Sequence, residues 1–266
     1  MGTEMSFRDL HHGDRPLLLP NAWDYTTGAA LAAAGFAAVG TTSLGVAAAA
    51  GRPDSAGDTR AETLALARLL ARLPVPVTVD AEGGFSDDPG EVAALVAELA
   101  GYGIAGVNIE DGRADGSLRP VDRQTAVIAA VRSAAPGIFI NARTDTFWLA
   151  GAAGPDLAAT LRRVEAYARA GADGVFVPGV AREADIAALV RDVPLPLNVL
   201  FLPGRTDVNR LAGLGVRRVS LGSLLYRTAL HAAVSTATGI RDTGTAPEGP
   251  IPSYAEVQRL LTGERP

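Results

Sequence analysis

Carboxylates at the ends of two short β-branched segments are the residues of this chain best suited to chemistry. In the run 75–88, VPVTVDAEGGFSDD, Asp80 and Glu82 are two positions apart, so on an extended strand they point to one face. The run 106–111, GVNIED, repeats the pattern with Asn108 and Glu110. Because acids gathered at strand ends are costly to bury, they indicate a bound divalent cation.

Four acids are expected to lie around one opening at the strand ends: Asp54, Asp80, Glu82 and Glu110. Asp54 would reach it on the loop that follows the second strand. Like charges a few ångströms apart raise one another's pKa, and a hard cation relieves that repulsion. Mg²⁺ takes oxygen ligands and usually keeps water around one or two direct carboxylates. We therefore expect Asp80 to be the direct ligand and the other three acids to bind metal-coordinated water, with Mn²⁺ as the alternative ion. The competing interpretation, helix caps and solvated loop charges, accounts for Asp88 and can extend to Asp111, but it does not account for Asp80 and Glu110 at strand ends.

Arg143 is the cation expected at the same opening, because it ends another strand and shares a face with Asn141. Its guanidinium is shaped to hold a substrate carboxylate or phosphonate, although a surface pair with Asp145 is the alternative. We interpret His11 as a flexible N-terminal residue and Trp148 as packing. The other candidate substrate-binding residues also follow strands: Trp23, Thr42, Ser43, Leu44, Gly45 and Asn198.

The composition excludes several chemistries. The chain has 266 residues, is 48% apolar and carries a net charge of -5, which argues against nucleic acid or an anionic membrane as a partner. It contains no cysteine and no lysine, so thiolate nucleophiles, thiolate metal sites, Schiff bases and the P-loop lysine are absent. No apolar run is long enough to span a membrane and the start is no signal peptide, so we expect a cytoplasmic protein.

Strands alternate with helices eight times along the chain. The expected strands are 17–19, 36–43, 75–81, 106–110, 138–144, 174–178, 195–201 and 216–221, each followed by a helix. A long loop, 44–57, follows the second strand, and a Thr59–Glu62 capping box opens the next helix. The alternation predicts an α/β protein with a parallel sheet, and eight units predict a closed (β/α)8 TIM barrel with its active site at the C-terminal ends of the strands.

A further unit follows the barrel. The linker 244–252, GTAPEGPIP, leads to a helix that a Ser253–Glu256 capping box opens and that ends near Leu261. We divide the chain into a catalytic barrel, 1–243, and a unit 244–266 whose helix packs on its own barrel or on that of a partner subunit.

Six motifs, taken together and in this order, resemble the isocitrate lyase / phosphoenolpyruvate mutase superfamily. They are PNAWD (20–24), TTSLGVAAAAGRPD (41–54), VDAEGGF (79–85), NIED (108–111), INARTD (140–145) and PLNVL (196–200). The resemblance implies Mg²⁺, a small 2-oxo or 2-hydroxy acid, an enolate intermediate and a helix-swapped homo-oligomer, a dimer or tetramer. It makes Asp80 a metal ligand, Glu82 and Glu110 metal-shell acids, Asp54 a metal-shell or catalytic acid, Arg143 a substrate clamp and residues 42–45 a carboxylate site.

The chain departs from the family's lyases in one loop. Those lyases carry a Lys-Lys-Cys-Gly-His motif after the fourth strand, whereas residues 112–120 read GRADGSLRP. Glu82 also stands where the family usually has an aspartate. These departures argue against isocitrate or methylisocitrate lyase activity.

The function expected is that of a Mg²⁺-dependent lyase. It would cleave a C–C bond of a small 2-hydroxy or 2-oxo carboxylate, with Asp54 or Glu110 as the base. The alternative is a phosphoenolpyruvate/phosphonopyruvate mutase or C–P bond hydrolase. Two other classes stay open: a phosphate-binding barrel using residues 203–204 and 221–223, and a catalytically inactive barrel that acts as a binding protein.

Overall fold

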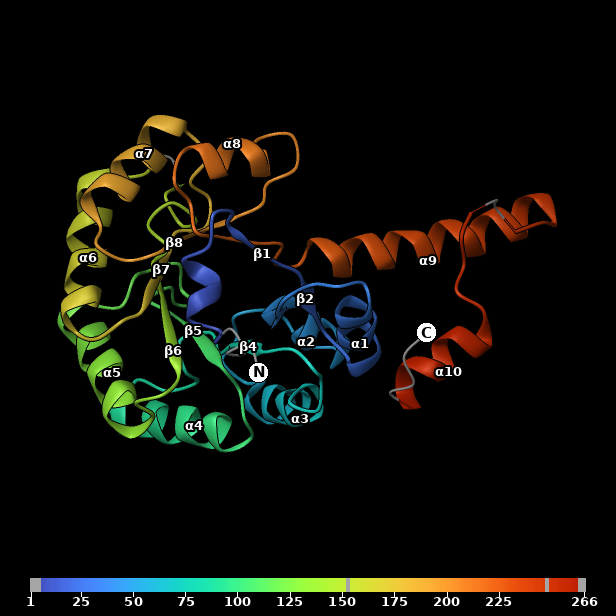
Figure 1. Cartoon of the computed structure of the whole chain (residues 1–266), viewed down its shortest axis with the longest axis horizontal. Coiled ribbons are helices and arrows are strands. Elements are labelled where there is room, and N and C mark those ends of the chain that lie inside the picture. Colours follow the sequence, from blue (N-terminus) through green and yellow to red (C-terminus); the bar gives the residue numbers. More distant parts are fainter. Residues whose placement is uncertain (1–5, 152–153, 247–248, 263–266) are drawn as a thin grey trace.

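The computed structural model describes residues 6–151, 154–246 and 249–262. In these residues nine parallel strands form one sheet in the order β1-β9-β8-β7-β6-β5-β4-β3-β2, and Figure 1 shows the sheet curled into a barrel. The strands are β1 (Leu17–Leu19), β2 (Asn21–Ala22), β3 (Val39–Thr41), β4 (Val77–Asp80), β5 (Gly106–Glu110), β6 (Phe139–Arg143), β7 (Gly174–Phe176), β8 (Leu197–Leu200) and β9 (Arg218–Ser220). The predicted (β/α)8 barrel is confirmed.

The first strand of the barrel is split at Pro20. Before it, β1 pairs with β9, and after it, β2 pairs with β3. Proline has no N–H to give to a neighbouring strand. Its carbonyl accepts from Gly40 N at 2.8 Å, so the chain changes hydrogen-bonding partner at this residue. One strand position therefore joins the first and last units of the barrel.

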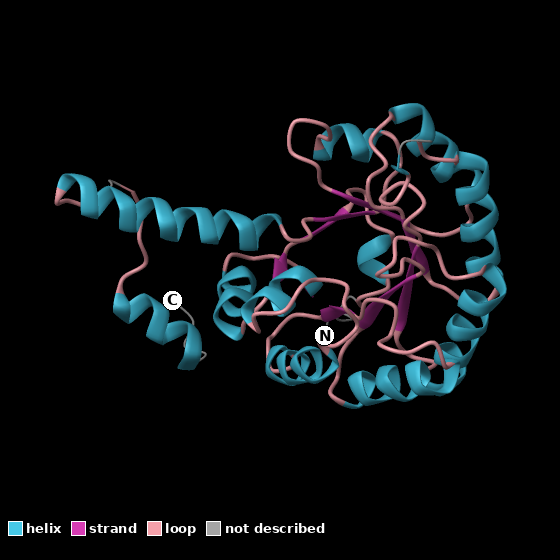
Figure 2. Ribbon diagram, turned by 180° about the vertical axis from the view of Figure 1, so that it is seen from behind, coloured by secondary structure: helices cyan, strands magenta, loops and turns pink. Residues whose placement is uncertain are grey.

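Helices surround the barrel (Figures 1 and 2). They are α1 (Tyr25–Ala33), α3 (Arg60–Leu70), α4 (Pro89–Gly101), α5 (Val121–Ala134), α6 (Leu157–Arg169), α7 (Glu183–Asp192) and α8 (Val208–Gly213). Four begin at an aspartate whose side chain accepts from backbone N–H groups of the first turn: Asp24, Asp88, Asp156 and Asp207. These caps satisfy donors that a helix start otherwise leaves unpaired.

The core lies between the strands and the helices. Val79, Val107 and Ile109, which alternate with the polar strand residues, are fully buried. Val92 and Leu99 on α4 are buried against the same layer, as the helical spacing of apolar residues predicts. The apolar residues of β4 and β5 therefore face the helices and leave the barrel interior to the polar ones.

Two local predictions were wrong. The loop 44–57 contains a short helix, α2 (Ser43–Ala49), because its alanine-rich sequence forms a helical turn. Thr59 makes no side-chain cap for α3; its hydroxyl donates elsewhere.

His11 is not flexible, contrary to our expectation. It ends the 3-10 helix η1 (Asp9–His11), is 2% exposed and stacks on Phe139 with ring centroids 4.2 Å apart. Its Nδ1 lies 2.9 Å from the Phe7 carbonyl oxygen, and burial lowers the pKa of His11 to about 3. A neutral histidine and two phenylalanines therefore cover the N-terminal end of the barrel.

The C-terminal helices differ from the rest. In Figures 1 and 2, α9 (Leu224–Thr243) extends away from the barrel and α10 (Tyr254–Thr262) turns back towards α1. The Ser253–Glu256 capping box is confirmed: Ser253 N donates to Glu256 Oε2 at 2.7 Å, and Glu256 N donates to Ser253 Oγ at 3.2 Å. Residues 247–248 and 263–266 of the predicted unit 244–266 lie outside the described residues. Within the described chain every helix is too short or too polar to cross a lipid bilayer.

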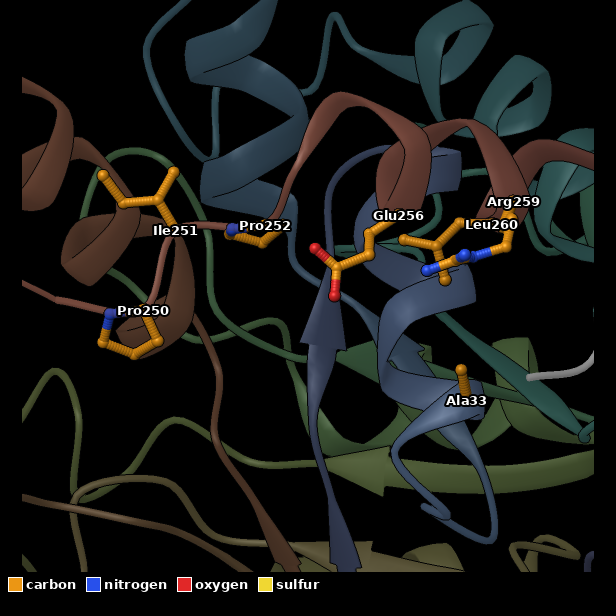
Figure 3. A pocket seen from close by; sticks show the side chains of 7 residues that line it. All are labelled: Ala33, Pro250, Ile251, Pro252, Glu256, Arg259 and Leu260. Atoms are coloured by element: carbon orange, nitrogen blue, oxygen red, sulfur yellow. The ribbon is translucent and has the colours of Figure 1, made fainter.

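A cavity of about 400 Å³ lies between this unit and α1, beside the contact that α10 makes with α1. Figure 3 shows Ala33 of α1 below Arg259 and Leu260 of α10, with Ile251 and Pro252 of the linker on the other side of Glu256. The predicted site residues do not line this cavity and lie instead at the strand ends.

Candidate active site

A cavity of about 120 Å³ lies at the C-terminal ends of the strands. Its lining includes six of the residues that the sequence predicts for the site: Thr42, Ser43, Leu44, Asp54, Asp80 and Arg143. Trp148 and Phe176 also line it. Its volume suits a ligand of a few heavy atoms.

Asp80 ends β4 and carries an oxygen that the protein does not satisfy. Its backbone N donates to Thr41 Oγ1 at 2.8 Å, and its Oδ2 accepts from Ser43 N at 3.4 Å. Its Oδ1 is buried and has no hydrogen-bond partner among the described residues. A buried carboxylate oxygen without a partner is costly and indicates a ligand.

Glu82 reaches the acid cluster through a turn and not by strand alternation. Because β4 ends at Asp80, Glu82 lies beyond it, with a backbone φ of 49° in the left-handed region. Its Oε1 accepts from Thr59 Oγ1 at 2.8 Å. Burial raises the pKa of Glu82, the Thr59 hydrogen bond opposes this, and the charges of Asp80 and Asp54 raise it further. The turn therefore holds an acid in a strained position beside others.

Glu110 and Arg143 are buried ion-pair partners. Arg143 Nη1 lies 2.7 Å from Glu110 Oε2, and Arg143 Nε lies 2.7 Å from Asp145 Oδ1. The surface-pair interpretation of Arg143 and Asp145 was wrong, because the Asp145 side chain is only 4% exposed. The two pairs use Nη1 and Nε, so Nη2 remains for a ligand in the cavity.

Burial and charge act together on this group. Burial raises the pKa of Glu110 well above its ordinary range, although the positive charge of Arg143 opposes this. The negative charges of Asp145, Asp80 and Glu82 raise the pKa further. Burial alone would lower the pKa of Arg143, but Glu110, Asp145 and Asp80 raise it overall. The arginine therefore stays charged and the surrounding carboxylates outnumber it.

Asp54 reaches the cavity from the segment after α2. It lines the 120 Å³ cavity and an adjoining one of about 340 Å³ that Glu110 and Arg143 also line. Burial raises the pKa of Asp54, a hydrogen bond from Ser43 opposes this, and the Asp80 charge raises it further. A carboxyl with a raised pKa beside a cavity is placed to accept a proton from a ligand.

The donor set fits Mg²⁺ with a small number of direct protein ligands. Among the described residues no three His, Cys, Asp or Glu side chains converge closely enough to hold a metal by themselves. The unpartnered Asp80 Oδ1 supplies one hard oxygen, with further acids nearby. Mg²⁺ commonly takes one or two carboxylates and completes its shell with water and substrate oxygens.

Three predicted substrate-binding residues lie outside the cavity lining. Trp23 packs edge-on against Tyr226 with ring centroids 5.2 Å apart. Gly45 lies against Trp23, where an added Cβ would come within 2.8 Å of it. Asn198 is buried in the barrel and accepts from Ser220 Oγ at 3.1 Å. The first two support the turn around Ser43, and the third lies among the polar residues inside the barrel.

The loop 112–120 is fixed to the barrel by Arg119. Its Nη2 donates to the carbonyl oxygens of Gly83 and Ser86 at 2.9 and 3.1 Å, and its Nη1 donates to Gln124 Oε1 at 2.8 Å. Asp115 lines a cavity of about 400 Å³ that Glu82 and Glu110 also line. Arg119 is thus a structural anchor, and Asp115 is one of several loop residues, with Arg113 and Ala114, that line this cavity.

Two residues that the sequence reasoning missed organise the site. Asp111 is fully buried, accepts from Tyr167 Oη at 2.6 Å and Thr144 Oγ1 at 2.8 Å, and receives the Asp145 backbone N–H at 2.9 Å. Asp111 directly follows Glu110, the last residue of β5, and the alternation of that strand continued by one residue predicts a side chain directed towards the helices. The second residue, Arg218, is an arginine buried inside the barrel. It belongs to the expected eighth strand, 216–221, and its residue type gave no indication that it would be buried.

Trp148 lines the cavity and does not only pack. It is 54% exposed and also lines the adjoining cavity of about 340 Å³. An exposed indole at the edge of a ligand-sized cavity is placed to contact whatever the cavity binds.

Comparison with known proteins identifies the family. The family model for phosphoenolpyruvate phosphomutase matches residues 7–241, most of the chain. The chain belongs to the isocitrate lyase / phosphoenolpyruvate mutase superfamily. The resemblance noted in the six sequence motifs is thereby confirmed.

Three members of the superfamily illustrate the match. An uncharacterized protein from Mycobacterium tuberculosis is 44% identical over 257 residues, covering 97% of this chain and 96% of that protein. A 2-methylisocitrate lyase from Bacillus subtilis is 30% identical over 200 residues, covering 72% of this chain and 64% of the lyase. A crystal structure from Burkholderia cenocepacia J2315 is 41% identical, covers 87% of this chain and 97% of that one, and has a TM-score of 0.82. Superfamily homologues are lyases and mutases, which supports an enzyme.

Proposed function

We propose that the protein is a Mg²⁺-dependent lyase that cleaves a C–C bond of a small 2-hydroxy or 2-oxo carboxylate. The observation that carries the proposal is the unpartnered Asp80 Oδ1 in a cavity that Asp54 and Arg143 also line. The named B. subtilis relative, a 2-methylisocitrate lyase, supports this reaction class.

Mg²⁺ would be held directly by Asp80, with Glu82, Glu110 and Asp54 around it. When bound, it would supply positive charge to the oxygens that become negative as the C–C bond breaks. This assignment follows from the donor set described above.

The protein's own side chains account for positioning and proton transfer. Asp54 would accept the hydroxyl proton of a 2-hydroxy acid, and the C2 oxygen would form a carbonyl as the C2–C3 bond breaks. The electrons of that bond would give an enolate of the carboxylate on C3, which takes up a proton to complete the second product. Asp54 suits this role better than Glu110, because Glu110 is engaged by Arg143 and does not line the small cavity. Arg143 Nη2 would hold a substrate carboxylate by a single charge-assisted hydrogen bond, not by the bidentate fork expected from the sequence.

The test is product analysis by ¹H and ³¹P NMR. Purified protein is incubated with oxaloacetate, isocitrate, 2-methylisocitrate, a 2,3-dimethylmalate-type acid or phosphonopyruvate, each with Mg²⁺ and with EDTA. We expect pyruvate, succinate or glyoxylate to form only with Mg²⁺ and not with the Asp80→Asn variant. Turnover that survives both EDTA and Asp80→Asn would contradict the proposal.

Phosphonopyruvate mutase or C–P hydrolase activity is the second candidate. The matching family model is that of phosphoenolpyruvate phosphomutase, and the loop 112–120 lacks the cysteine of the family's lyases. A change in the ³¹P spectrum with phosphonopyruvate, and no change with the carboxylic acids, would favour it.

The phosphate-binding barrel loses support from the hydrogen bonds. Its proposed anion site needs free backbone N–H groups at 221–223, but Leu221 N and Gly222 N both donate to Asn21 Oδ1, at 3.1 and 2.8 Å. A catalytically inactive barrel would bind Mg²⁺ and a dicarboxylate without turnover, which the same NMR panel distinguishes.

We also propose that α9 and α10 pack on a second copy of the chain. The α9 helix has no buried residue, and Leu230 and Val234, one turn apart, are each 55% exposed. Exposed apolar residues on a long helix favour a protein contact.

A further inference from the structure

A charged side chain lies inside the barrel beneath the candidate site. Arg218 begins β9, is 1% exposed and is one of the largest fully buried side chains of the described chain. Its strand register pairs it with Asn198 of β8 and Leu17 of β1. It therefore belongs to the polar interior that the strands enclose.

No carboxylate of the described residues lies within ion-pair distance of Arg218. Its Nε donates to Ser220 Oγ at 3.2 Å and its Nη2 donates to Asn108 Oδ1 at 3.3 Å. Its Nη1 is buried and has no partner within the part of the chain that the structure describes. A buried cation without a counter-ion is costly, so its presence calls for a compensating role.

Both of its hydrogen-bond partners line the 120 Å³ cavity. Arginine can only donate, so Asn108 must turn its oxygen towards Arg218. The same oxygen accepts from Asn141 Nδ2 at 2.8 Å. The Nδ2 group of Asn108 is thus the end left for the cavity, where it can donate to an anionic ligand.

The charge of Arg218 also reaches the site. Burial lowers the pKa of Arg218 to about 9, and the charge of Asp80 acts in the opposite direction. At neutral pH the guanidinium is therefore still positive. A positive charge beneath the cavity attracts a dianion and repels a divalent cation.

We propose that Arg218 is a positioning residue that makes the cavity select a doubly charged carboxylate. It fixes Asn108 and Ser220 in the floor of the cavity and holds a positive charge below them. The proposal deepens the proposed function, since it names the charge class of the substrate, and it rests on that function. It also separates the roles of two arginines: Arg143 contacts the substrate, and Arg218 acts through its neighbours.

The experiment compares Arg218→Met and Arg218→Lys with Arg217→Met. Arg217 is the adjacent residue and is exposed, so its replacement removes the same charge from the surface. Calorimetry measures the affinity of oxalate in the presence of Mg²⁺, and electron paramagnetic resonance measures the affinity of Mn²⁺ alone. Circular dichroism verifies the fold of each variant.

The expected signature has opposite signs for the two ligands. Arg218→Met should lower the affinity for oxalate by about 3- to 30-fold and raise the affinity for Mn²⁺ by several-fold. Both changes follow from removal of one buried positive charge. Arg218→Lys should recover part of the oxalate affinity, and Arg217→Met should match the wild type. A purely structural role would weaken both ligands together.

Asn108→Ala keeps the proposal testable should Arg218→Met fail to fold. This variant removes the Nδ2 donor of Asn108 and leaves the charge of Arg218 in place. The affinity for oxalate should therefore fall, while the affinity for Mn²⁺ stays within about two-fold of the wild type. Unchanged oxalate affinity in a folded Arg218→Met or Asn108→Ala variant, or a parallel loss of both ligands, would overturn the proposal. Turnover by the wild-type protein in the NMR panel is read separately, so failure of the proposed function is distinguishable from failure of this inference.

Discussion

Thr59 donates its hydroxyl hydrogen to Glu82 across 2.8 Å, in a buried position that joins the start of α3 to the turn after β4. The two residues are 23 positions apart. This bond fixes one oxygen of an acid whose backbone lies in the left-handed region. Thr59 therefore serves the acid cluster and not the helix that follows it.

Replacement of Thr59 by valine should destabilise the protein at neutral pH by about 1–3 kcal/mol, because it leaves a buried carboxylate oxygen without its donor. Burial raises the pKa of Glu82 in the folded state and the Thr59 hydrogen bond only opposes this, so the bond contributes fully above that raised pKa and its contribution is lost as acid protonates Glu82. Urea unfolding at pH 7.5 and at about pH 4 measures the difference. Thr59→Ser keeps the hydroxyl and should stay near the wild type; an equal loss in both variants would rule out the hydrogen bond as the cause.

Asp80→Asn should lower the rate of metal-dependent turnover by about 100-fold or more. It should not lower the stability of the metal-free protein. The substitution removes one of several mutually repelling charges and preserves the shape of the side chain. Melting temperatures with EDTA and with Mg²⁺ provide the measurement. We expect no stabilisation by Mg²⁺ in this variant, whereas Asp192→Asn, at an exposed position of α7, should respond as the wild type does.

The stability of the metal-free protein should fall as pH rises from mildly acidic values. The pKa values of Asp54, Glu82 and Glu110 are raised above their ordinary values of 3.8, 4.5 and 4.5, first of all by burial. In the pH window between the unfolded and folded pKa values the folded state binds more protons, so stability is lost as pH increases. Mg²⁺ should offset this loss, and its stabilising effect should be larger at pH 8 than at pH 5. Thermal unfolding across that range tests both statements; a Mg²⁺ effect that shrinks with rising pH would contradict them.

Arg143→Lys should not be a conservative change. Arg143 uses Nη1 for Glu110 and Nε for Asp145, and a single ammonium group cannot occupy both positions. One buried carboxylate loses its partner, so we expect a loss of about 2–4 kcal/mol at neutral pH together with weaker substrate binding. Denaturant unfolding and KM measure the two effects. Arg182→Lys is the matched control: Arg182 pairs with Asp185 but its side chain is 75% exposed, so the change should cost much less stability than Arg143→Lys.

The order of strands and helices could be predicted from the sequence because each strand and helix carries its own signal. Val107 and Ile109 alternate with polar residues, and the spacing of Val92 and Leu99 marks a helical face. Parallel strands place their C-terminal ends at one edge, so the meeting of Asp80 with Arg143 follows from the barrel itself. These features depend on short stretches of chain and on one rule of topology.

The remaining details depend on side chains from distant segments. Nothing near Thr59 indicates that it would bond to Glu82 and leave the helix start uncapped, and nothing near Arg218 distinguishes it from the exposed Arg217. Trp23 follows β2 and Asn198 lies within β8, yet Trp23 packs on Tyr226, Asn198 accepts from Ser220, and neither lines the cavity. A strand position specifies which face a residue occupies but not how far its side chain reaches.

The lack of buried residues on α9 has a thermodynamic consequence. Apart from the contact of Tyr226 with Trp23 near its start, α9 packs little against the barrel and gains little stability from its own chain, since propensity alone leaves isolated helices marginal. If a second copy supplies the missing contacts, association and the ordering of this helix are one linked equilibrium, and dilution should loosen it before the barrel unfolds. Amide hydrogen exchange in residues 224–243 should then quicken as the protein concentration falls, while exchange in the barrel strands stays constant.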